Sequence, residues 1–245
     1  MIRHRLRKDT PGKRIAVVPE KPLIQMRDIT KIYRSSAGEF TALADINLDF
    51  YPGEFVGVIG KSGSGKSTLA NMITGIDHPS RGEIVIQDHS INKMNESDRS
   101  VWRGNNLGIV FQFYQLLPTL TLLENVMLPM DFCGRYDTSE REDRAFELLK
   151  MVGLDDFALK LPEMTSGGQQ QSAAIARALA NDPPIIIADE PTGNLDENSA
   201  AVVFELFCGL VDKGKTIIMV THDPLLADRT SRTVRLHDGR VVETE

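Results

Sequence analysis

Cysteine is scarce in this sequence, with only Cys133 and Cys208 among 245 residues. Two cysteines so far apart exclude both a disulfide framework and a zinc site built from cysteine ligands. We therefore expect the two thiols to fill the interior of a reduced, cytoplasmic protein.

Long hydrophobic runs are also missing from the sequence. No stretch approaches the roughly 18 apolar residues that a membrane-spanning helix requires. The basic N-terminal segment lacks the apolar core and the cleavage site of a secretory signal. Hydrophobic residues make up 41% of the chain and charged residues 25%, a balance typical of a globular protein and too apolar for a disordered one. We expect that the chain does not cross a membrane by itself.

Basic residues are concentrated at the N-terminus, and in the rest of the chain acidic residues outnumber them. Residues 1–21 carry a net charge of +5 and the remainder a net charge of −11, which together give −6. An acidic body argues against a general nucleic-acid binder, so we do not expect nucleic acid among the partners. Residues 1–22 are predicted to form a basic, disordered arm. Contact between this arm and anionic lipid is the alternative.

Short apolar runs alternate with helical patterns along the rest of the chain. We predict strands at residues 55–59, 82–87, 107–111, 185–188 and 216–220, and helices at residues 66–74, 138–152, 166–179 and 200–211. The last two strand segments are continuous runs of β-favouring residues, as in strands that are covered on both faces. A strand, a helix and a strand at this spacing imply a parallel α/β sheet.

The region from about residue 110 to residue 179 is rich in helical patterns and is predicted to form a lobe beside that sheet. Within the helix at residues 138–152, apolar residues repeat at helical spacing and are expected to share the buried face. These residues are Ala145, Phe146, Leu148, Leu149 and Val152.

The clearest chemical motif runs from Gly60 to Ser67 and fits the pattern G-x-x-x-x-G-K-[S/T] between a predicted strand and a predicted helix. Glycines at this place let backbone N–H groups surround a phosphate at a helix N-terminus. Lys66 is expected to reach the β- and γ-phosphates of ATP, and the Ser67 hydroxyl to bind Mg²⁺. The alternative is a glycine- and serine-rich turn with a chance lysine. The nucleotide-binding residues predicted in this segment are Gly60, Lys61, Ser62, Gly63, Ser64, Gly65, Lys66, Ser67 and Thr68.

Two acidic residues, Asp189 and Glu190, follow the apolar run at residues 185–188. A carboxylate at the carboxyl end of a strand beside a phosphate loop can hold Mg²⁺, and we assign this role to Asp189. Glu190 can polarise the water that attacks the γ-phosphate. Two acids after an apolar run are also a common strand exit, so the assignment depends on the phosphate loop about 120 residues earlier.

A second helix start carries the sequence Ser166-Gly-Gly-Gln169. A serine followed by two glycines presents free N–H groups and a hydroxyl to an anion, although an ordinary N-cap would use the same residues. The chain has one nucleotide loop but two anion-binding helix starts. We therefore expect the second one to serve a nucleotide held by another subunit.

In this order the motifs resemble those of ABC ATPases across residues 24–243. Gly60 to Ser67 resembles the Walker A motif, and Asp189-Glu190 resembles the end of Walker B. Three further segments are similar to the signature, the D-loop and the switch histidine: residues 166–169, residues 194–196 and His222. Gln112 stands where the family has its Q-loop glutamine.

A finer similarity is to the group that serves macrolide export, lipoprotein release and peptide-antibiotic resistance. It rests on the segments Phe111–Pro118, Leu123–Val126 and Glu190–Asp196. The resemblance implies an α/β P-loop NTPase with a RecA-like core, an antiparallel β edge sheet and an inserted helical subdomain. The ABC ATPase domain would span residues 23–245 and the helical subdomain about residues 112–180.

The resemblance also implies roles for single residues. Tyr33 would stack on adenine, unless it is only a surface aromatic. Gln112 would bind Mg²⁺ together with Ser67 and Asp189 and would sense the membrane partner. His222 would contact the γ-phosphate and orient Glu190, so that the implied catalytic set is Lys66, Glu190 and His222. Ser166, Gly167, Gly168 and Gln169 would bind the nucleotide of a second copy, and Asp196 would line the dimer interface or cap a helix.

The function implied is that of an ATP-hydrolysing subunit of an ABC transporter. Two copies would pack head-to-tail around two Mg·ATP and drive a membrane permease from the cytoplasmic face of the membrane. One alternative is an ABC ATPase that acts through a membrane partner to regulate cell-envelope processes without transport. Another is a soluble ABC ATPase acting on ribosomes or DNA, which the single cassette and the lack of a heptad run disfavour.

The sequence departs from the family pattern near the signature. Thr165 stands where leucine is usual, Ser172 where arginine is usual, and Ala173 where valine is usual. None of these changes removes a phosphate donor. We expect them to affect the firmness of dimer closure or the coupling to the membrane partner, not the binding of phosphate.

Overall fold

The computed structural model describes residues 21–36 and 38–244 of the chain. Apart from Lys21 and Pro22, the predicted basic arm at residues 1–22 lies outside the described residues. Within them, no helix combines the length and the hydropathy that crossing a membrane requires.

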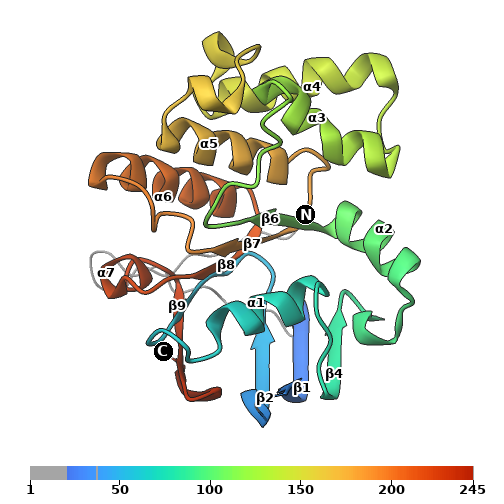
Figure 1. The fold of residues 1–245 in the computed structure, drawn as a ribbon, viewed down its shortest axis with the longest axis vertical. Coiled ribbons are helices and arrows are strands. Elements are labelled where there is room, and N and C mark those ends of the chain that lie inside the picture. Colours follow the sequence, from blue (N-terminus) through green and yellow to red (C-terminus); the bar gives the residue numbers. More distant parts are fainter. Residues whose placement is uncertain (1–20, 37, 245) are drawn as a thin grey trace.

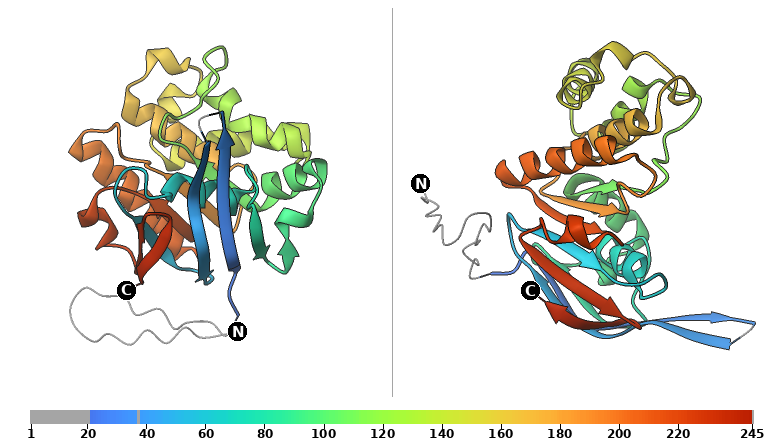
Figure 2. Two further views of the ribbon diagram at one scale, coloured as in Figure 1. Left: turned by 60° about the horizontal axis from the view of Figure 1, so that its bottom comes forward. Right: turned by 90° about the vertical axis from the view of Figure 1, so that its left-hand side faces the viewer.

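A four-stranded antiparallel sheet forms one side of the molecule. Its strands are β1 (Ile24–Ser35), β2 (Gly38–Phe50), β4 (Arg81–Ile86) and β5 (His89–Ser90), in the order β2-β1-β4-β5. Ile24 and Met26 of β1 are buried, whereas the ends of β1 and β2 at residues 34–35 and 38–40 are exposed. Figure 2 shows this end of the β1–β2 hairpin projecting beyond the rest of the fold. The antiparallel edge sheet implied by the family resemblance is confirmed.

The second sheet has six strands in the order β10-β9-β3-β8-β7-β6. They are β3 (Phe55–Ile59), β6 (Leu107–Val110), β7 (Ile185–Asp189), β8 (Thr216–Val220), β9 (Arg232–His237) and β10 (Arg240–Thr244). All neighbours pair in parallel except β10 and β9. Every residue of β3 and β8 is buried, because helices or the other sheet cover both faces. The predicted parallel α/β sheet is confirmed.

Seven α-helices complete the described part of the chain. They are α1 (Lys66–Thr74), α2 (Glu96–Asn106), α3 (Leu122–Cys133), α4 (Thr138–Met151), α5 (Gly167–Ala178), α6 (Glu197–Asp212) and α7 (Pro224–Ala227), with short 3₁₀ turns at Ile91–Lys93, Asp155–Phe157 and Pro162–Met164. α1 shares one apolar cluster with both sheets, while α5 and α6 pack on the other face of the six-stranded sheet. Figure 1 shows the resulting layers, with α3, α4 and α5 gathered at the end away from β1 and β2.

The helices α3, α4 and α5 share an apolar cluster of their own, although the proposed subdomain limits near residues 112 and 180 stay a prediction. Ala145 and Leu149 of α4 are buried in this cluster, but Phe146 is 42% exposed. The prediction that Phe146 faces the interior is therefore wrong, because each helical residue turns about 100° from the one before it. Cys133 and Cys208 are only half-buried, so the expectation that both fill the interior holds in part.

The contact between α6 and β3 allows a test of which face of α6 belongs to the hydrophobic core. Phe207 is fully buried, and its ring meets the ring of Phe55 edge-on with centroids 6.3 Å apart. We expect Phe207→Ala to lower the free energy of unfolding by about 3–5 kcal/mol, because it removes a buried aromatic side chain and leaves a cavity. Val202→Ala on the exposed side of the same helix should change it by less than about 1 kcal/mol. Urea denaturation of the two variants measures the difference, and equal losses would contradict the assignment of this face as core.

Candidate active site

Residues 60–65 form the loop that joins β3 to α1, and its geometry requires glycine at the last position. Gly65 has a φ of 102°, and a Cβ atom there would lie 2.6 Å from the carbonyl oxygen of Ala42. The buried Lys66 side chain folds back over the loop, where its Nζ donates to the carbonyl oxygens of Gly60 at 2.9 Å and Lys61 at 3.2 Å. The loop therefore holds an ammonium group in place beside the N-terminus of α1.

A hydroxyl and a carboxylate meet at the start of α1. The Ser67 hydroxyl donates to Asp189 Oδ1 at the end of β7 over 3.3 Å. Burial raises the pKa of the Asp189 carboxyl and the charge of Glu190 adds to this rise, whereas the bond from Ser67 opposes it. A half-buried carboxylate beside a hydroxyl is a set of hard oxygen donors, which suits Mg²⁺ and its preference for one or two carboxylates plus phosphate oxygens. The residues present fit a magnesium ion.

Glu190 and His222 form a pair beside this oxygen cluster. Glu190 follows β7 and His222 follows β8, so the parallel pairing of these strands places both at the carboxyl edge of the sheet. Glu190 Oε2 lies 2.7 Å from Nδ1 of His222. Glu190 has a φ of 48°, a left-handed conformation that is uncommon for a side chain of this size. A carboxylate held by an imidazole in this way can act as a general base with a fixed orientation.

These groups converge on one pocket of about 430 Å³, a volume usual for a small-molecule site. Its lining residues are Phe40, Ala42, Ser62, Gly63, Gly65, Lys66, Ser67, Thr68, Gln112, Glu190 and His222. The structure therefore brings together nine of the predicted nucleotide-binding and catalytic residues, six of them in the phosphate loop and at the start of α1. The predicted residues that are not among the lining residues are Tyr33, Gly60, Lys61, Ser64, Ser166–Gln169, Asp189 and Asp196. Phe40 and Ala42 line the pocket and were not predicted from the sequence.

Tyr33, the residue expected to stack on adenine, contacts Lys31 on the same strand and Asp77 after α1. Its hydroxyl donates to Asp77 Oδ2 over 2.9 Å, and the Lys31 ammonium lies 4.8 Å from the centre of its ring. Burial and the bond to Asp77 raise the pKa of the Tyr33 hydroxyl. The pKa of Asp77 is lowered, because its bond from Lys31 and two further hydrogen bonds outweigh the effect of burial.

The loop that carries Gln112 is anchored at three points. Asn194 donates to the carbonyl oxygen of Gln112 over 3.0 Å. Two and three residues later, Tyr114 and Gln115 both have left-handed backbones, with φ values of 47° and 53°. Their carbonyl oxygens accept hydrogen bonds from the Arg177 guanidinium of α5 at 2.7 Å and 2.5 Å. Burial lowers the pKa of this arginine.

The helix start at Ser166 is a complete capping box. The Ser166 hydroxyl oxygen accepts from the backbone N–H of Gln169, whose side chain accepts in return from the Ser166 N–H. Thr165, where the family usually has leucine, donates its hydroxyl to the carbonyl oxygen of Pro162 over 2.7 Å. A hydrogen bond thus supports the loop at this position in place of apolar packing. Ser172, where arginine is usual, is buried.

Asp196 also caps a helix. Its carboxylate accepts hydrogen bonds from the backbone N–H groups of Asn198 and Ser199 and from the Ser199 hydroxyl, at the start of α6. The N-cap alternative considered from the sequence is therefore realised, and it leaves a dimer contact by Asp196 open as a further role.

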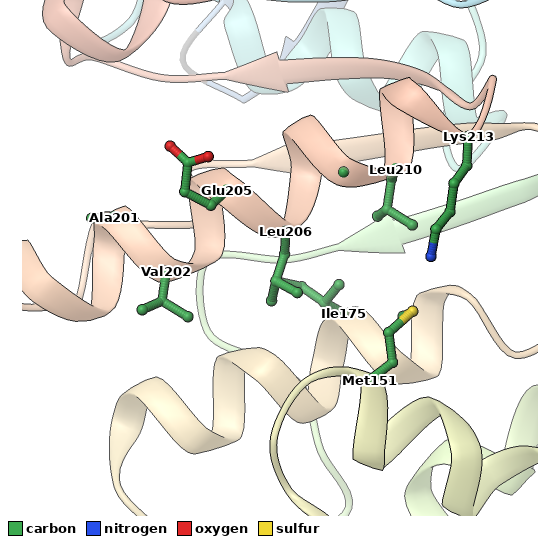
Figure 3. Close-up of a pocket in the computed structure, with 9 residues that line it drawn as sticks. Met151, Ile175, Ala201, Val202, Glu205, Leu206, Leu210 and Lys213 are labelled. Atoms are coloured by element: carbon green, nitrogen blue, oxygen red, sulfur yellow. The ribbon is translucent and has the colours of Figure 1, made fainter.

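A separate groove of about 480 Å³ runs along α6. Figure 3 shows its apolar side chains, among them Met151, Val202 and Leu206, with Glu205 and Lys213 as the charged groups labelled there. Glu205 already pairs with Arg229. Without a glycine-rich loop or converging cations, this groove does not suit a nucleotide phosphate.

A family model described as "ABC transporter" matches residues 43–193, which include the phosphate loop, Ser166–Gln169 and the Asp189–Glu190 pair. The chain belongs to the ABC transporter family. It is an ATP-binding subunit of an ABC transporter and an ABC ATPase. The ABC fold expected from the motifs is likewise confirmed.

Curated relatives match this ABC ATPase over nearly their whole length. An uncharacterized ABC transporter ATP-binding protein of Methanocaldococcus jannaschii is 47% identical over 90% of this chain and 98% of its own. The lipoprotein-releasing system ATP-binding protein LolD of Bacteroides thetaiotaomicron is 42% identical over 89% of this chain and 99% of its own. These relatives confirm the expected similarity to the lipoprotein-release group.

A solved structure is similar as well. It is the dimeric ATP-binding cassette MJ0796 of M. jannaschii in a post-hydrolysis state bound to ADP and Pi. It superimposes with a TM-score of 0.85 at 42% identity, covering 91% of this chain and 97% of the other.

Proposed function

We propose that two copies of this ABC ATPase close head-to-tail around two Mg·ATP, and that closure drives a membrane permease. The observation that carries this proposal is the pocket where Lys66, Ser67, Glu190 and His222 converge while the Ser166 helix start lies outside its lining. A pocket with this composition supplies a cation, a metal ligand and a base, whereas the second anion-binding helix start lies outside the pocket of its own copy. The dimer of the archaeal cassette, which holds ADP and Pi, supports the same arrangement.

In this proposal the phosphate loop, Gly60 to Thr68, binds the nucleotide with its backbone N–H groups. Lys66 neutralises the β- and γ-phosphates. Ser67, Asp189 and Gln112 would hold the magnesium ion, which supplies positive charge to the transferred phosphoryl group. Glu190 takes the proton from the attacking water, and the contact with His222 at 2.7 Å keeps its carboxylate oriented.

The second copy would complete the site with its residues 166–169. In the capping box the Ser166 hydroxyl acts as an acceptor, so its proton is available to a γ-phosphate oxygen across the interface. Asp196 would lie at the same interface, next to the start of α6. Tyr33 is assigned to the base of the nucleotide by family resemblance.

The membrane partner would dock in a groove of about 580 Å³ between α2, α3 and α5. Phe132 on its rim is 83% exposed, and Val101 on the facing helix is also exposed. Gln115 and Arg177 line the same groove, so a segment bound there would touch the residues that anchor the Gln112 loop. Exposed apolar side chains beside such a groove suit a partner with an apolar anchor. In this proposal the ABC ATPase is a peripheral subunit at the cytoplasmic face of a membrane.

Affinity purification of the full chain from its native membrane tests this proposal. We expect a multi-spanning permease to accompany the wild type and to be lost, by about tenfold or more, with Phe132→Glu, because a charge in the apolar groove is costly to bury. Leu159→Glu, an exposed leucine outside the groove lining, is the matched control. Both purified variants should hydrolyse ATP as the wild type does. Recovery of ribosomal or DNA-repair proteins with no membrane protein would overturn the transport function and leave the ATPase intact.

A further inference from the structure

Tyr114 places a hydroxyl group at the start of α5, beside the segment Ser166–Gln169. A Cβ atom on Gly167, the first residue of the helix, would lie 2.8 Å from the Tyr114 hydroxyl oxygen, so the hydroxyl packs directly against this glycine. The left-handed backbone of Tyr114 and the hydrogen bond from Arg177 to its carbonyl oxygen fix the main chain that carries the ring. The hydroxyl is therefore held at the anion-binding end of α5.

The Tyr114 hydroxyl differs from the other hydroxyl that borders this helix start. A Cβ atom on Gly168 would lie 2.9 Å from Ser199 Oγ, but the Ser199 hydroxyl already donates to Asp196 over 2.6 Å. Within residues 21–36 and 38–244, no group accepts the proton of the half-buried Tyr114 hydroxyl. Tyrosine hydroxyls that are taken out of water usually bond to a partner. This proton is therefore available to a group that approaches the helix start.

A second polar side chain reaches the same place from within the helix. Gln171 is fully buried, and neither its amide oxygen nor its amide nitrogen has a hydrogen-bond partner in the described part of the chain. Because each helical residue turns by about 100°, Gln171 points between the directions of Gly167 and Gly168 one turn earlier. Helical side chains lean toward the N-terminus, and the two glycines have no side chains to stop it. The Gln171 amide is therefore directed at the space between the Tyr114 and Ser199 hydroxyls.

The unpaired amide of Gln171 points to a partner in another state of the protein. A buried amide without hydrogen bonds destabilises the fold. The donors at this helix start suit a phosphate group, because the N–H groups of Gly167 and Gly168 have no partner within the helix and the helix dipole favours an anion. These donors are neutral, and a hydrogen bond from a neutral donor to an ionised phosphate oxygen is among the stronger ones.

We propose that, when two copies close, the Tyr114 hydroxyl donates to a γ-phosphate oxygen of the nucleotide held by the second copy, while the Gln171 amide N–H donates to the Tyr114 oxygen. The inference rests on the proposed head-to-tail dimer and adds two residues to its interface. Tyr114 binds the nucleotide across the interface, and Gln171 is a positioning residue that orients the hydroxyl. Because ADP has no γ-phosphate, this contact favours closure with ATP over closure with ADP.

Sedimentation equilibrium of the full chain carrying Glu190→Gln, with Mg·ATP present, tests the proposal in a background that holds the dimer without turnover. Adding Tyr114→Phe removes one oxygen atom and keeps the ring. We expect the dimer Kd to rise about 100-fold, because each of two sites loses one charge-assisted hydrogen bond that contributes about tenfold. The affinity of a single copy for ATP should stay within about twofold. Tyr136→Phe, whose ring stays against Arg144, is the matched control.

Gln171→Leu in the same background tests the second contact. We expect it to raise the dimer Kd by about fivefold or more, and to add nothing when combined with Tyr114→Phe, because Gln171 acts through the hydroxyl. Its unfolding temperature should not fall, since leucine removes a buried unpaired amide. Additive losses in the double variant would contradict the contact between Gln171 and Tyr114.

Two further outcomes would overturn the proposal. A dimer Kd within about threefold of the background in the Tyr114→Phe protein would remove the hydroxyl from the interface. An equal loss of ATP affinity in the single copy would place the hydroxyl in the site of its own copy. If the Glu190→Gln protein itself forms no dimer with Mg·ATP, the proposed dimer is wrong and this inference fails with it, which is a distinguishable result.

Discussion

Lys66→Ala is expected to bind ATP about 100-fold more weakly than the wild type and to hydrolyse none at millimolar ATP. Lys66 is the lysine that lines the pocket, and the carbonyl oxygens of Gly60 and Lys61 hold its ammonium in place. A hydrogen bond to a charged group contributes about 1.5–3 kcal/mol, and an ammonium facing two phosphates makes more than one. The substitution also removes the donor for two loop carbonyl groups, so the loop loses its shape as well as its charge.

Equilibrium titration with ATP and a phosphate-release assay measure these effects. Lys93→Ala is the matched control, because Lys93 is an exposed lysine paired with Glu83 outside the pocket. Thermal unfolding of both variants separates loss of binding from loss of fold. ATP affinity in Lys66→Ala within about threefold of the wild type would refute the role of this side chain.

Glu190→Gln should retain ATP binding and lose turnover by about 10²- to 10⁴-fold, the contribution typical of general base catalysis. Glutamine has the same shape and can keep a hydrogen bond to His222, so the pocket keeps its geometry. It cannot accept the proton of the attacking water. Because hydrolysis would no longer reset the dimer, a species of twice the mass should accumulate with Mg·ATP.

Size-exclusion chromatography with and without Mg·ATP and single-turnover kinetics check this expectation. Glu142→Gln on the exposed face of α4 serves as a charge-matched control. A Glu190→Gln protein that turns over ATP at the wild-type rate would show that another group activates the water.

The positions of the strands and of the phosphate loop follow from local signals. The runs of β-favouring residues at 185–188 and 216–220 are short and bounded, as buried strands are, and the backbone angle of Gly65 requires glycine. Asp189 and Glu190 could be predicted for the site because carboxyl ends of parallel strands meet at one edge. The pairing of Glu190 with His222 at 2.7 Å follows from the adjacency of β7 and β8.

Other features depend on contacts that no local pattern records. Phe40 lies opposite Tyr33 in the β1–β2 pairing and lines the pocket together with Ala42. No sequence motif identifies it as a pocket residue. Arg177 belongs to a helix 62 residues after Gln115 in the chain, yet it binds that residue's carbonyl oxygen. Phe146 is 42% exposed because of the way α4 is rotated about its axis against α3 and α5. Helical spacing alone does not determine this rotation to within one residue.

The three-point anchoring of the Gln112 loop has a mechanical consequence. Pulling the carbonyl oxygens of Tyr114 and Gln115 away from Arg177 would break two charge-assisted hydrogen bonds, each contributing about 1.5–3 kcal/mol. Moving the loop together with α5 breaks neither. We therefore expect the segment at Tyr114 and Gln115 to move together with α5, a helix of twelve residues and about 18 Å. A displacement of this segment would then also move Ser166, which caps the other end of α5.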